Sequence, residues 1–295
     1  MDGKKVKVIY ILGYERSGST ILHNLIGQMP AFFSVGELRH IWRRGNDNRP
    51  CGCGQPFKDC SFWQGVYDHQ NPYKQHFRES LFAITKLMSV IPSLRKRLTG
   101  HKAYLKELYT KALEKSGKEY IVDHSKSVMH LKLLSQIEGF DVKTIHIVRD
   151  PRGIEYSMYK RQLKGLDRYK NHSVWKNVIK IDLVNRMAQR FMDRYSLKTH
   201  TLRYEDLVRQ PKETLEKMTN DLEIASDFSF IEEDGVILQP THSVGGSPSR
   251  HNTGKIQLKL DDKWKASLPD KKRKRIEGFS STYKKWYRNE DLSQV

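Results

Sequence analysis

A turn near the N-terminus has the composition of a phosphate-binding loop. Residues 13–20 read Gly-Tyr-Glu-Arg-Ser-Gly-Ser-Thr and directly follow the apolar run 8–12. Glycine lets the backbone approach a ligand closely, and the unpaired N–H groups at the start of a following helix attract anions. Ser19 stands where the triphosphate-binding motif G-x-x-x-x-G-K-[ST] requires lysine. The turn therefore predicts a phosphate site with Arg16 as its cation, without the usual triphosphate and Mg²⁺.

A second anion site is predicted where another strand-like run, residues 142–148, ends at Arg149. Ligands of open α/β folds bind at the carboxyl edge of the sheet, where Arg149 would emerge. Ser157 lies about two turns along the helix that Pro151 begins, so it can face the same anion. Arginine supplies a bidentate charged contact and serine a short neutral one. The same pattern would also fit a capped helix with a surface arginine.

Groups suited to proton transfer follow two other predicted strands. Glu37 comes after residues 32–35 and could accept a proton as a general base, although a carboxylate also stabilises a nearby helix start. His40 and His124 are the alternative bases. Lys126 follows residues 120–123 and would lie at the same edge of the sheet.

Residues 120–123 permit a different interpretation. They could be the strand of a kinase whose aspartate, Asp123, holds Mg²⁺. The missing lysine of the opening turn argues against that function. A P-loop kinase or related NTPase is nevertheless the alternative enzyme.

The elements that must position these residues alternate along the chain. Strands are predicted at 8–12, 32–35, 120–123, 142–148 and 199–202, and helices at 20–28, 73–98, 101–115, 128–137, 151–163, 174–195, 211–222 and 270–287. Alternation of this kind predicts an α/β, P-loop-like three-layer fold, with a central parallel sheet and helices on both faces. No linker or repeat divides the chain, so residues 1–295 are predicted to form a single domain. Residues 239–264 read as a long ordered loop.

The charge balance predicts an anionic partner. There are 53 Lys and Arg residues against 34 Asp and Glu, which gives a formal net charge of +19. A nucleic-acid binder would use this charge, but no aromatic-interleaved recognition motif accompanies it. The basic run 271–275 is interpreted as the solvated face of a helix. No signal peptide or membrane-length apolar run is recognised, so we expect a soluble, cytoplasmic protein.

The three cysteines, Cys51, Cys53 and Cys60, lie close together in the sequence. Zinc would need a fourth ligand, for which His40 or His69 is the candidate. A local disulfide or plain thiols in a compact loop is the preferred interpretation, and no metal site is predicted.

Taken together, these motifs resemble the sulfotransferases that use 3′-phosphoadenosine 5′-phosphosulfate (PAPS), particularly the carbohydrate and tyrosyl-protein branch and its bacterial relatives. The likeness runs in order from about residue 8 to residue 264. It rests on residues 13–20, 35–38, 121–126, 147–157, 242–250 and 261–264. In the late loop Ser247 replaces the asparagine that bacterial members commonly have, so only Arg250 is carried over from it.

The resemblance implies a role for each residue. PAPS would be the donor and 3′-phosphoadenosine 5′-phosphate (PAP) the product, with no metal. The 5′-phosphosulfate would be held by Arg16, Ser17, Gly18, Ser19, Thr20 and Ile21, and the 3′-phosphate by Arg149, Ser157 and Arg250.

For the transfer itself, the resemblance makes Glu37 the base that deprotonates an acceptor hydroxyl. Arg16 and Lys126 would stabilise the departing oxygen. Residues 41–115 would shape the acceptor site. The sequence identifies neither the acceptor, whether carbohydrate, small molecule or peptide, nor the oligomeric state.

Overall fold

Five parallel strands form the central sheet. The structure is a computed structural model and describes residues 5–68, 92–166 and 172–289. In spatial order the strands are β2, β3, β1, β4 and β5. Their bounds are Val6–Gly13 for β1, Phe32–Gly36 for β2, Tyr120–Asp123 for β3, Phe140–Val148 for β4 and Thr199–Arg203 for β5. The predicted α/β fold with a parallel sheet is confirmed.

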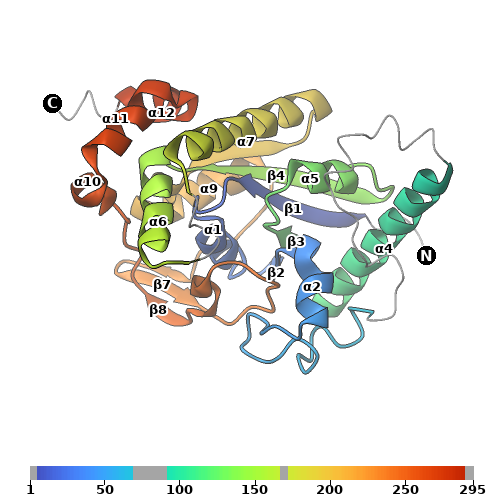
Figure 1. Ribbon diagram of the computed structural model, residues 1–295. Helices are drawn as coiled ribbons and strands as arrows, with labels where there is room; N and C mark the ends of the chain where they lie inside the picture. Colours follow the sequence, from blue (N-terminus) through green and yellow to red (C-terminus); the bar gives the residue numbers. More distant parts are fainter. Residues whose placement is uncertain (1–4, 69–91, 167–171, 290–295) are drawn as a thin grey trace.

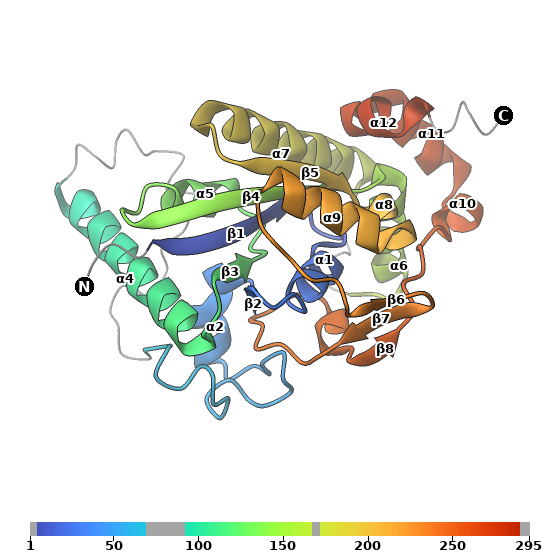
Figure 2. The same ribbon diagram turned by 180° about the vertical axis from the view of Figure 1, so that it is seen from behind.

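Helices cover both faces of this sheet (Figures 1 and 2). Because successive side chains of a strand point to opposite faces, β1 contributes to two cores. Val8 and Tyr10 share a core with α4 (Pro92–Ser116), α5 (Val128–Leu134) and α7 (Val174–Tyr195). Ile9 and Ile11 share the other with α1 (Ser19–Ile26) and α9 (Pro211–Asp221). This arrangement is the predicted three-layer architecture.

The parallel strands bring the predicted site residues to one edge. The strands β1 to β4 end at Gly13, Gly36, Asp123 and Val148, and the chain leaves each of them on the same side of the sheet. The next strand, β5, runs into α8 (Tyr204–Arg209). The loops that carry the phosphate turn, the general-base candidates and Arg149 are therefore neighbours.

Two helices begin and end where the sequence predicts. These are α6 (Pro151–Leu163) and α7. Asp150 caps α6 by accepting a hydrogen bond from the Arg152 backbone N–H at 2.8 Å, and Pro151 occupies the first turn. A proline there loses no helical hydrogen bond, which is why this start is readable from sequence.

The prediction of a helix break near residue 100 is wrong. One helix, α4, runs through Gly100, while residues 73–91 of the preceding predicted helix lie outside the described residues. A glycine inside a helix costs about 1 kcal/mol relative to alanine. Burial of Tyr104, Leu105 and Leu108 against the sheet offsets that cost.

The C-terminal helix is also divided where a single helix was predicted. It follows α10 (Trp264–Ser267) and consists of α11 (Asp270–Phe279) and α12 (Ser281–Trp286). Ser280 interrupts it in an extended conformation (ψ 120°). Its hydroxyl accepts from the Tyr283 N–H at 3.2 Å and lies 2.9 Å from the Asp182 carboxylate on α7. The capping serine therefore ends one helix and starts the next.

Several short elements were not predicted. They are η1 (Leu38–His40), α2 (Ile41–Asn46), η5 (Pro248–His251), α10, and the antiparallel strands β6 (Ile231–Glu232), β7 (Gly235–Leu238) and β8 (Gly254–Ile256). The segment 239–264 is thus an ordered connection that contains η5 and β8 rather than a featureless loop. None of the helices in the described ranges is both long enough and apolar enough to span a membrane.

Candidate active site

The phosphate turn is built so that only glycine fits at its helix start. Gly18 precedes α1 with φ 88°, and a Cβ there would lie 2.3 Å from the Tyr204 ring. Arg16, although not a glycine, also has a left-handed backbone (φ 70°). Strained residues of this kind often occur at functional sites, where the surrounding structure holds them in place.

The second predicted anion site lies directly against this turn. The Arg16 Nε donates to the Ser157 Oγ at 3.1 Å, and Arg149 Nη1 donates to the Arg16 carbonyl at 2.9 Å. Arg161, one helical turn after Ser157, also donates to the Ser157 hydroxyl at 3.1 Å. The structure therefore brings together the two motifs that the sequence separates by more than a hundred residues.

Arg149 is held in place by its surroundings. Its side chain is buried, stacks over the Tyr204 ring at 4.3 Å, and lies 3.6 Å from the Asp261 carboxylate. These contacts orient the guanidinium toward the cleft described below. Asp261 also partly neutralises it.

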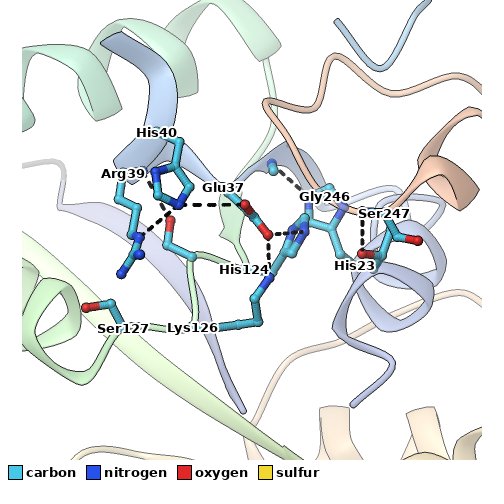
Figure 3. A network of polar contacts seen from close by, with 12 residues as sticks. His23, Glu37, Arg39, His40, His124, Lys126, Ser127, Gly246 and Ser247 are labelled. Atoms are coloured by element: carbon cyan, nitrogen blue, oxygen red, sulfur yellow. Dashed lines mark hydrogen bonds and ion pairs between the residues drawn. The ribbon is translucent and has the colours of Figure 1, made fainter. Parts of the chain in front are cut away.

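Glu37 is the centre of a polar network at the same edge (Figure 3). Its carboxylate forms an ion pair with the Lys126 ammonium group. His40 Nε2 and His124 Nε2 each lie 3.9 Å from a Glu37 oxygen. Both alternative bases therefore adjoin the preferred one, so proximity alone does not exclude either of them.

The pKa values distinguish these groups. Burial would raise the pKa of Glu37, but the charge and hydrogen bond of Lys126, together with the charges of His40 and Arg44, outweigh burial and lower the pKa below the ordinary value of 4.5. Burial, together with the neighbouring His23 and Lys126, lowers the pKa of His124 well below its ordinary value of 6.5. At neutral pH the network thus has an ionised carboxylate and an uncharged imidazole.

Gly36 places Glu37 in this network. It has φ 87°, and a Cβ there would lie 2.3 Å from the Val244 backbone nitrogen. Its own N–H donates to His23 Nε2 at 2.9 Å. The chain can turn from β2 toward Lys126 only because residue 36 has no side chain.

A cleft of about 610 Å³ joins the two halves of the site. Gly18, Ser19, Thr20 and Ile21 line it, whereas the buried Ser17 and Ser157 do not. The acidic groups in its lining are Glu15, Glu37 and Asp261. The basic ones are more numerous: Arg16, Arg39, Arg43, Arg44, Lys126, Arg149 and Arg161. This excess of cations suits a ligand with several negative charges.

The late loop covers α1 and reaches the cleft. The Ser247 N–H donates to Thr20 Oγ1 at 3.3 Å, and Asn24 Nδ2 donates to the Ser249 carbonyl at 3.2 Å. Arg250, however, is not in the cleft lining. Its guanidinium donates to the Gly246 carbonyl at 3.3 Å and the Pro50 carbonyl at 3.4 Å.

Asp123 is occupied by structural hydrogen bonds. Its carboxylate accepts from Tyr109, and the Ser125 N–H donates to it at 2.7 Å. It is fully buried and does not line the cleft. Holding Mg²⁺ in the manner of a kinase would require breaking these bonds, which argues against the alternative enzyme.

The sequence analysis did not identify four arginines that line the cleft. These are Arg39, Arg43 and Arg44, which follow Glu37, and Arg161, which follows Ser157. Helical spacing could have revealed Arg161, which is four residues after Ser157 on α6 and so lies on the same face. Arg39, Arg43 and Arg44 lie on η1 and α2, which the sequence analysis did not identify as helical. The segment 203–207 is part of the scaffold: Glu205 accepts from the Asp150 N–H at 3.1 Å and from Tyr287 at 2.8 Å.

Comparison with known proteins gives a consistent result. A family model described as "Sulfotransferase family" matches residues 8–227. The solved sulfotransferase domain from the curacin biosynthetic pathway is 19% identical, with a TM-score of 0.52 over 92% of this chain and 96% of that one. The sulfotransferase domain from the Synechococcus PCC 7002 olefin synthase is 20% identical, with a TM-score of 0.50 over 95% of this chain and 96% of that one. No curated protein sequence matches the chain.

Proposed function

This chain belongs to the sulfotransferase family, and we propose that it transfers the sulfuryl group of PAPS to an acceptor hydroxyl with Glu37 as the base. One observation supports this most strongly. Arg149 and Ser157 adjoin Arg16 of the phosphate turn, at the edge of the sheet where Glu37 and Lys126 form their ion pair. Groups for a doubly phosphorylated donor and for proton transfer thus lie together.

The residues present fit such a donor. PAPS has about four negative charges near neutral pH, since a phosphate monoester carries up to two and the phosphosulfate bridge the rest. The cleft has an excess of arginine and lysine, and the backbone of the phosphate turn leads directly into α1. Arg149 would bind the 3′-phosphate and so distinguish the donor from ordinary adenine nucleotides, while the buried Ser157 would hold Arg16 and Arg161 in place beside it. Arg16 and the turn residues 18–21, which line the cleft, would bind the 5′-phosphosulfate, with the buried Ser17 supporting the turn.

The transfer step makes one bond and breaks one. The acceptor oxygen forms a bond to sulfur, the bond from sulfur to the bridging phosphate oxygen breaks, and the acceptor proton passes to the Glu37 carboxylate. Glu37 is ionised at neutral pH and so can accept it. Lys126, already beside Glu37, and Arg16 would neutralise the charge that develops on the departing oxygen.

Arg250 would not take part in this donor site in the arrangement described. Its side chain turns toward the Gly246 and Pro50 carbonyls, so Arg149 would contact the 3′-phosphate without it. Arg161 is the additional cation on that side, because it donates to the Ser157 hydroxyl and lines the cleft.

Beyond Glu37 the cleft is basic as well. Arg39, Arg43 and Arg44 line this part. An acceptor with a negative charge close to its hydroxyl would be attracted there, so we expect anionic acceptors to react better than neutral ones of the same size.

The experiment is a transfer assay with PAPS radiolabelled in its sulfate. The enzyme is incubated with panels of sugars, phenols, lipids and peptides, each containing neutral and anionic members, and labelled products are separated from free sulfate. Transfer of label to a hydroxyl acceptor supports the proposal. Label released only as free sulfate, together with phosphorylated products from labelled ATP, would refute it.

A further inference from the structure

All three cysteines converge on a histidine from the far end of the chain. The Cys60 Sγ lies 3.6 Å from the Cys51 Sγ, 3.8 Å from the Cys53 Sγ and 3.2 Å from His242 Nδ1. The four ligand atoms all lie within 4.8 Å of one another. The cysteines are free thiols, so of the two predicted alternatives, a local disulfide or plain thiols, the disulfide is not formed.

The separations from the Cys60 sulfur are close to those of a tetrahedral metal site. With Zn–S bonds of about 2.3 Å and a Zn–N bond of about 2.0–2.1 Å, a regular tetrahedron places two sulfurs about 3.8 Å apart and a sulfur and a nitrogen about 3.6 Å apart. The sulfur pairs that include Cys60 match this spacing, and the pair with His242 is slightly shorter. Three cysteines and one histidine are a common ligand set of structural zinc sites.

The backbone around the cysteines is folded to hold them together. The Cys51 N–H donates to the Gln55 carbonyl at 2.8 Å, and the Gly54 N–H donates to the Cys51 carbonyl at 3.0 Å. Gly54 has φ 90°, a conformation that favours glycine. This tight turn directs the side chains of Cys51 and Cys53 to the same place.

His242 is fixed independently of the sulfurs. Its ring stacks on Phe62, with centroids 5.3 Å apart, and its carbonyl accepts from Trp63 Nε1 at 2.9 Å. The next residue, Ser243, accepts from the Gly52 N–H at 3.0 Å, and a Cβ on Gly52 would lie 2.3 Å from the Ser243 hydroxyl. The imidazole is therefore held with Nδ1 toward Cys60 by contacts that are not metal bonds.

We propose that Cys51, Cys53, Cys60 and His242 bind a structural Zn²⁺ ion. Each thiol releases its proton to solvent as its sulfur bonds to the metal, and His242 binds through Nδ1 as a neutral imidazole. Three thiolates with Zn²⁺ leave a net charge of −1. The Arg250 guanidinium, which donates to the carbonyl of Pro50 beside Cys51, provides a compensating positive charge.

The ion would tie two segments of the active site to each other. The cysteines follow α2, which carries Arg43 and Arg44, whereas His242 precedes Val244, whose backbone bonds with Val35 and Glu37. In the covalent chain, nearly two hundred residues separate these two segments. Zinc would join them directly and restrict their movement around Glu37.

The first experiment measures the metal content of the purified protein. The chain is purified without chelators and without metal-affinity chromatography, and zinc is determined by elemental analysis. We expect about one zinc per chain, as in other four-ligand structural sites. Stripped protein titrated with Co²⁺ should develop the intense visible absorption of a tetrahedral thiolate site.

Four variants test the ligand assignment. Cys60→Ser and His242→Ala should lose nearly all bound zinc. His242→Cys should retain it, because a cysteine sulfur can approximately replace Nδ1 in a four-cysteine site. His251→Ala is the matched control: His251 is exposed and its ring lies 3.2 Å from the Gly52 carbonyl, yet it is not a ligand, so zinc should remain.

Wild-type protein decides the matter even if the variants fold poorly. The proposal is overturned if the purified wild-type protein contains no zinc and its stripped form, titrated with Co²⁺, gives only the weak spectrum of hydrated Co²⁺. That result would show that the cluster is a set of buried thiols. Full zinc retention in folded Cys60→Ser and His242→Ala would overturn it as well. Neither result depends on the transfer reaction, so the outcome is separate from the fate of the proposed function.

Discussion

Replacement of Glu37 by glutamine tests the assignment of the base. Glutamine has nearly the same shape and can still accept a hydrogen bond from Lys126, but it cannot take up the acceptor proton at neutral pH. General-base catalysis typically contributes about 10²- to 10⁴-fold to a rate, or roughly 3–5 kcal/mol of barrier. We therefore expect Glu37→Gln to lower kcat by about 10²- to 10⁴-fold.

Donor binding should respond differently. In the native protein the Glu37 carboxylate pairs with Lys126, whose charge would otherwise act on an anionic ligand. Removing the carboxylate therefore leaves the affinity for PAP unchanged or makes it tighter. Glu15→Gln is the matched control, since Glu15 also lines the cleft but lies on the phosphate turn; its kcat should change by less than about tenfold.

The pH profile provides a second readout of the same residue. Because the pKa of Glu37 is lowered, the base stays ionised as the pH falls past 4.5, and kcat should decline only below that value. The Glu37–Lys126 pair also stabilises the fold above the unfolded-state carboxyl pKa, and this contribution is lost as the pH falls through the lowered folded-state value.

The assay is steady-state transfer with labelled PAPS, combined with calorimetric titration of PAP. If Glu37→Gln retains more than about a tenth of the wild-type kcat, Glu37 is not the base. His124 or His40 would then have that role, and Asn substitutions of each would identify it. A parallel loss of PAP affinity would mean instead that Glu37 organises the cleft without accepting a proton.

Two further changes test the donor site and the fold around it. Arg149→Ala should weaken PAP binding by about 10- to 150-fold, which corresponds to the loss of a charged hydrogen bond worth roughly 1.5–3 kcal/mol. Binding of adenosine 5′-phosphosulfate, which lacks the 3′-phosphate, should change little. Equal losses of affinity for both ligands would contradict the assignment. Gly36→Ala should reduce the free energy of unfolding by about 2–5 kcal/mol, because its Cβ would meet the Val244 backbone and its φ is left-handed. The control is Gly117→Ala, because Gly117 also has a positive φ but has open space around it. In denaturant unfolding, Gly36→Ala should lose about 1 kcal/mol or more of unfolding free energy beyond the loss in Gly117→Ala, and equal losses in the two variants would disprove the steric argument.

The sequence reveals the sheet and the positions of its loops because both depend on local patterns. The sequence analysis predicts all five parallel strands, and parallel strands necessarily gather the residues that follow them at one edge. Glu37, Lys126 and Arg149 could be placed at this edge for that reason. The interruption at Ser280 was not predicted, because it depends on Asp182 of a distant helix.

Contacts between segments that are far apart in the chain could not be predicted from the sequence. His242 lies 182 residues from Cys60, and nothing local marks it as a partner of the cysteines. Arg250 sits in a motif-like stretch, but the carbonyls of Gly246 and Pro50 determine where its side chain points. Arg161, by contrast, could have been identified from helical spacing alone.

The central claim is that the two anion sites bind the two phosphate groups of one nucleotide. Calorimetric titration of the wild-type protein with PAP and with ATP tests it most directly, in a chelator-free buffer with and without Mg²⁺. We expect PAP to bind more tightly than ATP and Mg²⁺ to add nothing to its affinity, because arginine and lysine neutralise the phosphates. Tighter binding of ATP, dependent on Mg²⁺, would contradict the account.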